Sequence, residues 1–213
     1  MNEKICYIVG SGENYKLDFL VKKEDFVIAA DGGLNYLQSK NISIDLIIGD
    51  FDSFSYNSIS DLNIKSLVLD KEKEETDMLA AVKKGMDKGY KLFYIYCGTG
   101  NRFDHTFANI QILFFLSKNK MRGHLIDKNQ IMTAVTNNSI KFSSDYNGYI
   151  SVFSYSNISS GVFIKGLKYE LENATIRNTY PIGVSNEFIG VESSITVKNG
   201  SLLIIFPRKS KKV

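Results

Sequence analysis

The pattern of apolar residues changes near residue 128, and this change constrains the fold more than any other feature of the chain. Before it, short apolar runs alternate with stretches of helical period. The clearest helix is expected at Thr76–Lys88, and a second, apolar nearly all round and therefore expected to be buried, at Phe107–Ser117. The expected strands are Ile5–Val9, Phe26–Ala30, Leu46–Ile48, Ser66–Leu69, Phe93–Tyr96 and Gly123–Ile126. Such alternation predicts βαβ units and a mostly parallel sheet.

After residue 128 the helical period disappears. The apolar runs are short and separated by clusters of Asn, Ser and Gly, which is typical of antiparallel strands. Examples of these runs are Ile150–Phe153, Val162–Lys165, Ser194–Lys198 and Leu202–Phe206. We therefore expect an α/β class protein, with an α/β domain at residues 1–128 followed by a β-sandwich domain at residues 129–213. No linker separates the halves, so a ligand site is expected between closely packed domains.

Composition excludes several classes of function. The chain has 213 residues, 44% of them apolar and 23% charged, with a formal net charge of +3. No basic stripe with interleaved aromatic residues occurs, so a nucleic-acid partner is not expected. No apolar run reaches the length of a membrane span, and the first residues lead directly into a strand, so we expect neither a membrane anchor nor a secretory signal.

The cysteines and histidines are too few for a metal or disulfide framework. Cys6 and Cys97 both lie in apolar runs, and no CxxC motif occurs. We expect two buried thiols in a reducing cytoplasm. A zinc site is not expected, because His105 and His124 are the two histidines of the chain.

Two carboxylates one residue apart, Asp50 and Asp52, follow the apolar run Leu46–Ile48. In an open α/β sheet, ligands bind at the edge where the strands end. Like charges this close repel, and a divalent cation with hard oxygen ligands, such as Mg²⁺, removes that cost. The alternative is that both are ordinary turn residues that cap the next segment.

Further acids follow two other strands. Asp31 is followed by two glycines, which allow a close approach of the backbone, and it is a candidate for the catalytic site or for a helix cap. Thr76 and Asp77 open the helix after the charged loop that follows the fourth strand. Asp77 is a candidate metal ligand, whereas a good N-cap and a favourable helix dipole would also explain the pair.

The loop after the strand that ends at Cys97 carries two glycines, an arginine, an aspartate and a histidine. Backbone amides at a helix start favour phosphate, and Arg102 adds a bidentate donor. His105 would contact phosphate or cap the helix, and Asp104 would hold a neighbouring Arg or His. With the acids at the other strand ends, this set predicts metal-assisted phosphoryl transfer.

The usual phosphate-binding motifs are absent. Gly10 and Gly12 begin a GxGxxG pattern, but Tyr15 occupies the third glycine position, and no GxxxxGK[ST] sequence occurs. The chain is therefore expected to be neither a Rossmann dehydrogenase nor a P-loop kinase. Either a nucleotide contact or a plain turn would explain the two glycines.

In order along the chain, these segments resemble the thiamine pyrophosphokinase family. The segments that carry the resemblance are Asp31-Gly32-Gly33, Gly49-Asp50-Phe51-Asp52-Ser53, Lys73 with Thr76-Asp77, Gly100-x-Arg102-x-Asp104-His105 with Asn109, Gly166-Leu167-Lys168-Tyr169-x-Leu171 and Gly183-Val184-Ser185-Asn186-Glu187-Phe188. Each is weak alone, but the ordered set is specific and covers most of the chain.

The resemblance implies pyrophosphoryl transfer from ATP to the hydroxyl of thiamine, giving thiamine diphosphate and AMP. It implies Mg²⁺ on Asp50, Asp52 and Asp77, with Arg102 on the phosphates and Asp31, or a metal-bound acid, near the attacking hydroxyl. It assigns the ATP site to Thr76, Gly100, Arg102, Asp104, His105 and Asn109.

For the second half, the resemblance assigns thiamine binding to Ser185 and Asn186, which a simple Ser-Asn turn would otherwise explain. It also implies a homodimer with sites between subunits, and two-fold dimers are the commonest oligomers.

Two departures from the family pattern keep other functions open. Glu74 stands where the family usually has aspartate, and Leu79 where it usually has glutamate. The chain also lacks tryptophan, so a ring that stacks on the substrate must be Phe, Tyr or His. The alternatives are a pyrophosphokinase for another heterocyclic alcohol, such as a hydroxymethylpterin, and a non-catalytic thiamine- or nucleotide-binding protein.

Overall fold

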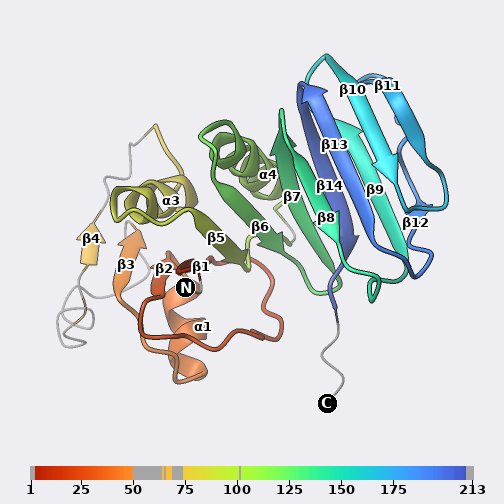
Figure 1. Cartoon of the computed structure of the whole chain (residues 1–213). Helices are drawn as coiled ribbons and strands as arrows, with labels where there is room; N and C mark the ends of the chain where they lie inside the picture. Colours follow the sequence, from red (N-terminus) through yellow and green to blue (C-terminus); the bar gives the residue numbers. More distant parts are fainter. Residues whose placement is uncertain (1–2, 50–63, 65, 69–73, 101, 210–213) are drawn as a thin grey trace. The chain divides into compact units, whose positions relative to one another are not determined.

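A computed structural model of the chain describes residues 3–49, 64, 66–68, 74–100 and 102–209 (Figure 1). The backbone divides into two compact units, Met1–Ile112 and Leu113–Val213, called the first and the second unit below. The division falls within helix α4 (Phe103–Lys118). The sequence-based division near residue 128 is kept as a proposal for the functional domains.

The first unit is built on a parallel sheet, as the alternating sequence pattern predicts. Its strand order is β5-β1-β2-β3-β4, and each neighbouring pair is parallel. The strands are β1 (Ile5–Val9), β2 (Phe26–Ala30), β3 (Leu46–Gly49), β4 (Ser66–Val68) and β5 (Leu92–Tyr96). Central strands are covered on both faces and therefore read as continuous apolar runs.

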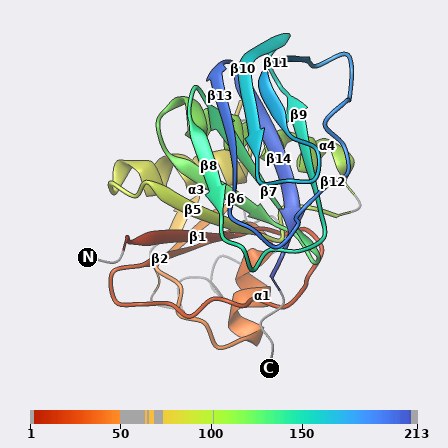
Figure 2. The same cartoon turned by 45° about the vertical axis from the view of Figure 1, so that its right-hand side comes forward.

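Helices α1 (Gly33–Ser39) and α3 (Asp77–Asp87) lie on opposite faces of this sheet in both views (Figures 1 and 2). The side chain of Thr76 caps α3 by accepting a hydrogen bond of 3.2 Å from the backbone N–H of Leu79. The buried side of α3 includes Met78 and Val82, which confirms the helical spacing read from the sequence.

Helix α4 differs in part from its prediction. It begins four residues before the predicted start at Phe107. Most apolar side chains of its second half are buried, with Leu113 and Leu116 fully inaccessible, but the Phe107 side chain is 49% exposed. The expectation of a helix buried all round is therefore wrong for its first turns, where apolar side chains face solvent.

The second unit consists of antiparallel strands in two sheets, as predicted. Five strands follow the order β12-β9-β14-β7-β6 and four the order β11-β10-β13-β8 (Figure 2). The first set is β6 (Arg122–Ile126), β7 (Gln130–Thr136), β9 (Tyr149–Ser154), β12 (Asn186–Glu187) and β14 (Ser201–Pro207). The second set is β8 (Ser139–Phe142), β10 (Ile158–Lys165), β11 (Leu171–Arg177) and β13 (Ser193–Asn199).

An aromatic cluster closes one end of the core of the second unit. The ring of Phe142 packs edge-on against Phe188 and Phe206, with centroid distances of 5.3 and 5.0 Å. Tyr146 stacks on Phe188 at 5.3 Å. Such pairs add to the stabilisation from apolar burial, so Phe188 anchors the segment that precedes it.

The two cysteines are free and buried, which confirms the prediction of buried thiols. Burial, with a smaller contribution from the Asp45 carboxylate, raises the pKa of the Cys6 thiol far above its usual value. None of the helices in the described part of the chain is long and apolar enough to cross a membrane.

Candidate functional site

The loop after β1 is bound to the loop after β5 by backbone hydrogen bonds. The N–H of Gly12 donates to the carbonyl of Cys97 over 2.7 Å, and the N–H of Glu13 donates to that of Thr99 over 2.9 Å. A Cβ atom on Gly12 would lie only 2.3 Å from the Thr99 oxygen. Glycine is therefore required here for the backbones to approach.

The loop after β2 lies beside the end of β1. A Cβ atom on Gly33 would lie 1.9 Å from the backbone oxygen of Val9. Gly32, not Asp31, is the N-cap residue of α1, and it makes no side-chain cap bond. Asp31 is therefore not the N-cap of α1, and the helix-cap alternative for this residue is wrong.

Asp31 and Cys97 both adopt left-handed backbone conformations, with φ of 51° and 52°. Each residue comes directly after a strand, at the carboxyl edge of the sheet. Non-glycine residues pay about 1 kcal/mol or more for this conformation, and such strain is often found at functional sites. Strand β1 has β2 on one side and β5 on the other, so the order in which strands are added to the sheet reverses at β1. Open α/β sheets bind ligands at such a switch point.

The predicted metal ligands are only partly described. Asp50 and Asp52 lie outside the described residues, although β3 ends at Gly49, the residue before Asp50. The backbone N–H of Asp31 donates to the carbonyl of Ile48 over 2.8 Å, so the ends of β2 and β3 are adjacent. Asp77 lies in the first turn of α3.

Arg102 and Asp104 form a bidentate ion pair on the surface. The guanidinium donates from Nη2 to Oδ2 over 2.6 Å and from Nε to Oδ1 over 3.2 Å. This hydrogen bonding from Arg102 lowers the pKa of Asp104 to about 2. The Arg102 side chain remains 71% exposed, so Asp104 orients the guanidinium, as expected from the sequence, while leaving it open to solvent.

The other candidates in this loop differ in exposure. The Asn109 side chain is buried and donates a 2.7 Å hydrogen bond to the carbonyl of Gly98, which ties the loop to α4. Gly100 has a φ of 140°, a region that favours glycine. His105 is exposed, with its Nε2 atom 3.9 Å from the Asp104 carboxylate.

In the second unit, Asn186 connects two of the sequence motifs. Its Oδ1 atom accepts from the backbone N–H groups of Tyr169 and Glu187, at 2.9 and 2.8 Å. Its Nδ2 atom donates to the Tyr169 carbonyl over 2.6 Å. The Asn186 amide therefore holds the segment around Tyr169 against β12, which leaves one N–H of the amide for any further partner.

Ser185 occupies a different environment. It has a left-handed φ of 58°, and its backbone N–H donates to the hydroxyl of Ser151 over 3.1 Å. The residue is exposed. Ser185 therefore presents its side chain at the surface beside the buried Asn186.

Both halves of the chain match family models for one enzyme. The model for the thiamin pyrophosphokinase catalytic domain matches residues 17–125, and the model for the thiamin pyrophosphokinase vitamin B1 binding domain matches residues 137–204. The chain belongs to the thiamine pyrophosphokinase family.

Relatives of this family share modest sequence identity with the chain. A thiamine pyrophosphokinase of Bacillus subtilis is 29% identical over 161 residues, covering 74% of this chain and 75% of the relative. Thiamin pyrophosphokinase 1 of Caenorhabditis elegans is 24% identical over 200 residues, covering 87% and 79%.

Solved structures of thiamine pyrophosphokinases share the fold. The structure from Bacillus subtilis superposes with a TM-score of 0.86 at 24% identity, over 98% of this chain and all of the other. The structure from Candida albicans gives 0.78 at 18% identity, over 98% and 90%. At these identities the likeness shows the fold alone.

Large apolar side chains are exposed in the segments before and after Ser185 of this thiamine pyrophosphokinase family member and at two positions joined to residues 186–187; they are called the apolar patch below. Tyr149 pairs with Glu187, and the Tyr169 backbone is bound by the Asn186 amide. Exposed apolar patches commonly mark binding surfaces. The members of the patch are Tyr149, Tyr169, Tyr180, Ile182, Val184, Ile189 and Val191. Sequence reasoning missed this patch, because isolated apolar residues in turns carry no periodic signal.

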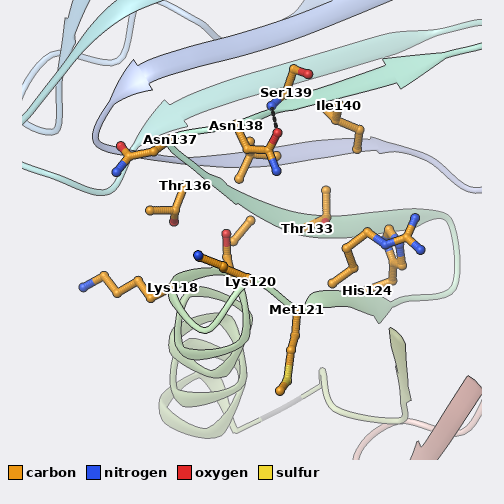
Figure 3. Close-up of a pocket in the computed structure, with 14 residues that line it drawn as sticks. Lys118, Lys120, Met121, His124, Thr133, Thr136, Asn137, Asn138, Ser139 and Ile140 are labelled. Atoms are coloured by element: carbon orange, nitrogen blue, oxygen red, sulfur yellow. Dashed lines mark hydrogen bonds between the residues drawn. The ribbon is translucent and has the colours of Figure 1, made fainter. Parts of the chain in front are cut away.

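The second unit also contains a cavity of about 490 Å³ that none of the sequence-predicted site residues line (Figure 3). It lies between the end of α4, strands β6 and β7, and the start of β8. Two basic residues near each other at a helix end, Lys118 and Lys120, were the available sequence signal for it.

Proposed function

We propose that the chain is a thiamine pyrophosphokinase, which transfers the pyrophosphoryl group of ATP to the hydroxyl of thiamine and gives thiamine diphosphate and AMP. The observation that carries the proposal is that models of the catalytic and the vitamin B1 binding domain both match, in order, in one chain. In the reaction the thiamine hydroxyl oxygen forms a bond to the β-phosphorus of ATP, and the bond between that phosphorus and the oxygen of AMP breaks.

The residues at the strand ends fit Mg²⁺ as the cofactor. In the described part of the chain, no three His, Cys, Asp or Glu side chains gather closely enough to form a metal site, and Asp50 and Asp52 lie outside that part. Carboxylate oxygens are nevertheless the ligands that Mg²⁺ prefers. We assign the metal to Asp50, Asp52 and Asp77, where it would neutralise charge on the phosphates.

The loop after β5 is proposed to hold the phosphates of ATP. The guanidinium of Arg102 is oriented by Asp104 and open to solvent, which suits a bidentate oxyanion donor. Gly100 and Asn109 are assigned to holding the backbone of this loop in shape. Thr76 and His105 have exposed polar side chains. Thr76 precedes the proposed metal ligand Asp77, and His105 follows Asp104, the partner of Arg102. Asp31 would orient or deprotonate the attacking hydroxyl.

The thiamine site is proposed at Ser185 and Asn186. Because the Asn186 amide already binds the backbone of Tyr169, we assign it chiefly to holding the loop, and Ser185 to contact with the substrate. Tyr169 is a candidate for stacking on the substrate, since the chain has no tryptophan and this ring is 61% exposed beside the loop.

A homodimer with shared sites forms part of the proposal. The apolar patch around the Ser185 loop supports it, because surfaces of this kind are usually covered by a partner. Mixing Asp50→Asn subunits with Ser185→Ala/Asn186→Ala subunits tests it. If sites are shared, mixed dimers regain one complete site and activity rises above both parents; subunit exchange without recovery would place each site within one chain.

The activity itself is tested by incubating the full chain with ATP, Mg²⁺ and thiamine and measuring AMP and thiamine diphosphate. Formation of both in equal amounts is expected. AMP formation only with a hydroxymethylpterin would support the alternative substrate, and binding without AMP formation would support a non-catalytic protein. A cytoplasmic location, in keeping with the two buried free thiols, completes the proposal.

A further inference from the structure

The cavity of the second unit has a strongly basic lining. Lys118, Lys120 and Arg122 contribute three permanent positive charges, and no aspartate or glutamate is among the residues that line it. Within the described part of the chain, neither lysine has an ion-pair partner. A concave site with this charge attracts anions.

The backbone at Lys120 gives an independent reason to expect a function. Helix α4 ends in a hydrogen-bonded turn in which the Met121 N–H donates to the carbonyl of Leu116 over 2.9 Å. Lys120 lies in this turn with a left-handed φ of 59°. Glycine is the usual residue at such a position, and lysine is strained there. A strained residue with a charged side chain at a cavity is a candidate for binding.

The wall of the cavity opposite the end of α4 also contains a residue in the left-handed conformation. Asn137, in the turn between β7 and β8, has a left-handed φ of 48°, and its Oδ1 atom accepts a 2.8 Å hydrogen bond from the backbone N–H of Gly200. Figure 3 shows Asn137 and Asn138 across from Lys118 and Lys120. The walls of the cavity are therefore fixed by hydrogen bonds on one side and by a helix end on the other.

The cavity lining also includes polar groups without a permanent charge, among them His124 and Thr133. His124 and Thr133 are paired across β6 and β7, and the Thr133 hydroxyl donates to the carbonyl of Gly123 over 2.8 Å. Burial, followed by the Arg122 charge, lowers the pKa of His124 to about 4. At neutral pH the imidazole is therefore uncharged, and Lys118, Lys120 and Arg122 provide the positive charge.

We propose that this cavity binds a small phosphorylated metabolite, whose phosphate is bound by Lys118 and Lys120 at the end of α4, while Arg122 adds to the positive potential. Arginine and lysine are the usual donors to phosphate oxygens. A cavity of about 490 Å³ has the size of a typical small-molecule site. The proposal is independent of the pyrophosphoryl transfer, because none of these residues belongs to the proposed catalytic or thiamine sites.

The two histidines of the chain provide the test. His124 lines the cavity, whereas His105 lies in the first turn of α4, directly after the loop proposed to bind ATP. Imidazole resonances of the full chain are followed by NMR during titration with inorganic phosphate, with AMP, and with acetate at constant ionic strength. We expect saturable shifts of the His124 signals with phosphate and AMP but not with acetate. Tighter binding of AMP than of phosphate would indicate that an organic group also contributes.

Lys120→Gly separates binding from folding. The change removes a charge and relieves the left-handed strain, so we expect weaker phosphate binding, by about tenfold or more, together with a melting temperature raised by about 2–4 °C. Lys165→Ala, which removes an exposed lysine of β10 outside the cavity, is the charge control. Asn41→Gly, at another left-handed position, is the backbone control. Both controls should keep wild-type phosphate binding.

Two outcomes would overturn the proposal. One is the absence of a saturable His124 shift with either phosphate compound. The other is a phosphate titration of Lys120→Gly that matches that of Lys165→Ala. A shift of His105 alone would support the proposed ATP site and refute the cavity, so the two proposals fail separately.

Discussion

The loops of the two units are held in place mainly by different groups. In the first unit, backbone hydrogen bonds and glycines hold most of the strand-end loops, with the buried Asn109 amide as a side-chain exception, and Arg102 stays exposed. In the second unit, buried polar side chains hold the loops. Asn186 binds the backbone of Tyr169, and the hydroxyls of Ser154 and Ser159 lie 2.8 Å apart in the core.

The difference follows from the two kinds of sheet. In a parallel sheet every strand ends at the same edge after a helical crossover, so topology alone gathers the loops. In an antiparallel sandwich, neighbouring strands end at opposite edges, and irregular loops need side chains to satisfy their backbone groups. Of two motif residues, Arg102 of the first unit is therefore exposed to a ligand, whereas Asn186 of the second unit supports its loop.

The largest effect is expected for a proposed metal ligand of the first unit. Asp50→Asn should lower kcat by about 1,000-fold or more, roughly 4 kcal/mol, because one carboxylate of the metal site is lost. The melting temperature should stay constant or rise slightly, because repulsion with Asp52 is relieved. Steady-state kinetics and thermal unfolding measure the two effects. Wild-type kcat at unchanged Mg²⁺ dependence would remove Asp50 from the metal site.

The next effect concerns the glycines that let the loops approach. Gly33→Ala places a Cβ 1.9 Å from the Val9 oxygen, and backbone must shift, which we expect to cost about 3 kcal/mol or more. The matched control is Gly190→Ala in the second unit, where φ is 79° but nothing lies within 4 Å of the new Cβ. It should cost only about 1 kcal/mol. An equal loss of unfolding free energy in the two variants, measured by urea denaturation, would show that the Gly33 backbone is not tightly packed against Val9.

The strands that sequence reasoning located are those that bury continuous or alternating apolar residues, such as β1 and β14. Strands β7, β8, β11 and β12 were not predicted. Strand β7 lies between β6 and β14, whereas β8 and β11 lie at the two edges of their sheet. Strand β11 has a single fully buried side chain, Ile176. Such strands are defined by hydrogen bonds to β13 or β10, which lie far away in sequence and leave little local pattern.

The candidate site was likewise predictable only in part. Motif spacing placed Asp31 and Arg102 at strand ends, because parallel strands share one ligand-binding edge. The internal role of the Asn186 amide was not predictable, since it depends on Tyr169, 17 residues earlier, being brought beside it. The cavity near Lys120 was also missed, because left-handed φ is a property of the folded turn.

A third prediction distinguishes the two members of the Ser-Asn pair. Asn186→Ala removes hydrogen bonds to part-buried backbone groups of Tyr169 and Glu187 and should cost about 1–3 kcal/mol of stability as well as thiamine affinity. Ser185→Ala should leave stability nearly unchanged and raise the KM for thiamine but not for ATP. Thermal unfolding and kinetics with each substrate varied separate these effects. Loss of stability in Ser185→Ala, with none in Asn186→Ala, would reverse the assigned roles.

The smallest effect is expected at Arg102, because charge is conserved. Arg102→Lys keeps the positive charge but loses the planar fork that binds both Asp104 oxygens and is proposed to bind phosphate. We expect kcat to fall about tenfold, equivalent to about 1.4 kcal/mol, with an unchanged melting temperature, since exposed ion pairs contribute little to stability. Asp104→Asn is the companion variant. It leaves Arg102 intact but removes the charge that orients it, so its kcat should fall less than that of Arg102→Lys. A fall in melting temperature without a fall in kcat would show that Arg102 supports the loop, as Asn186 does in the second unit, and would remove the contrast between the two units at this position.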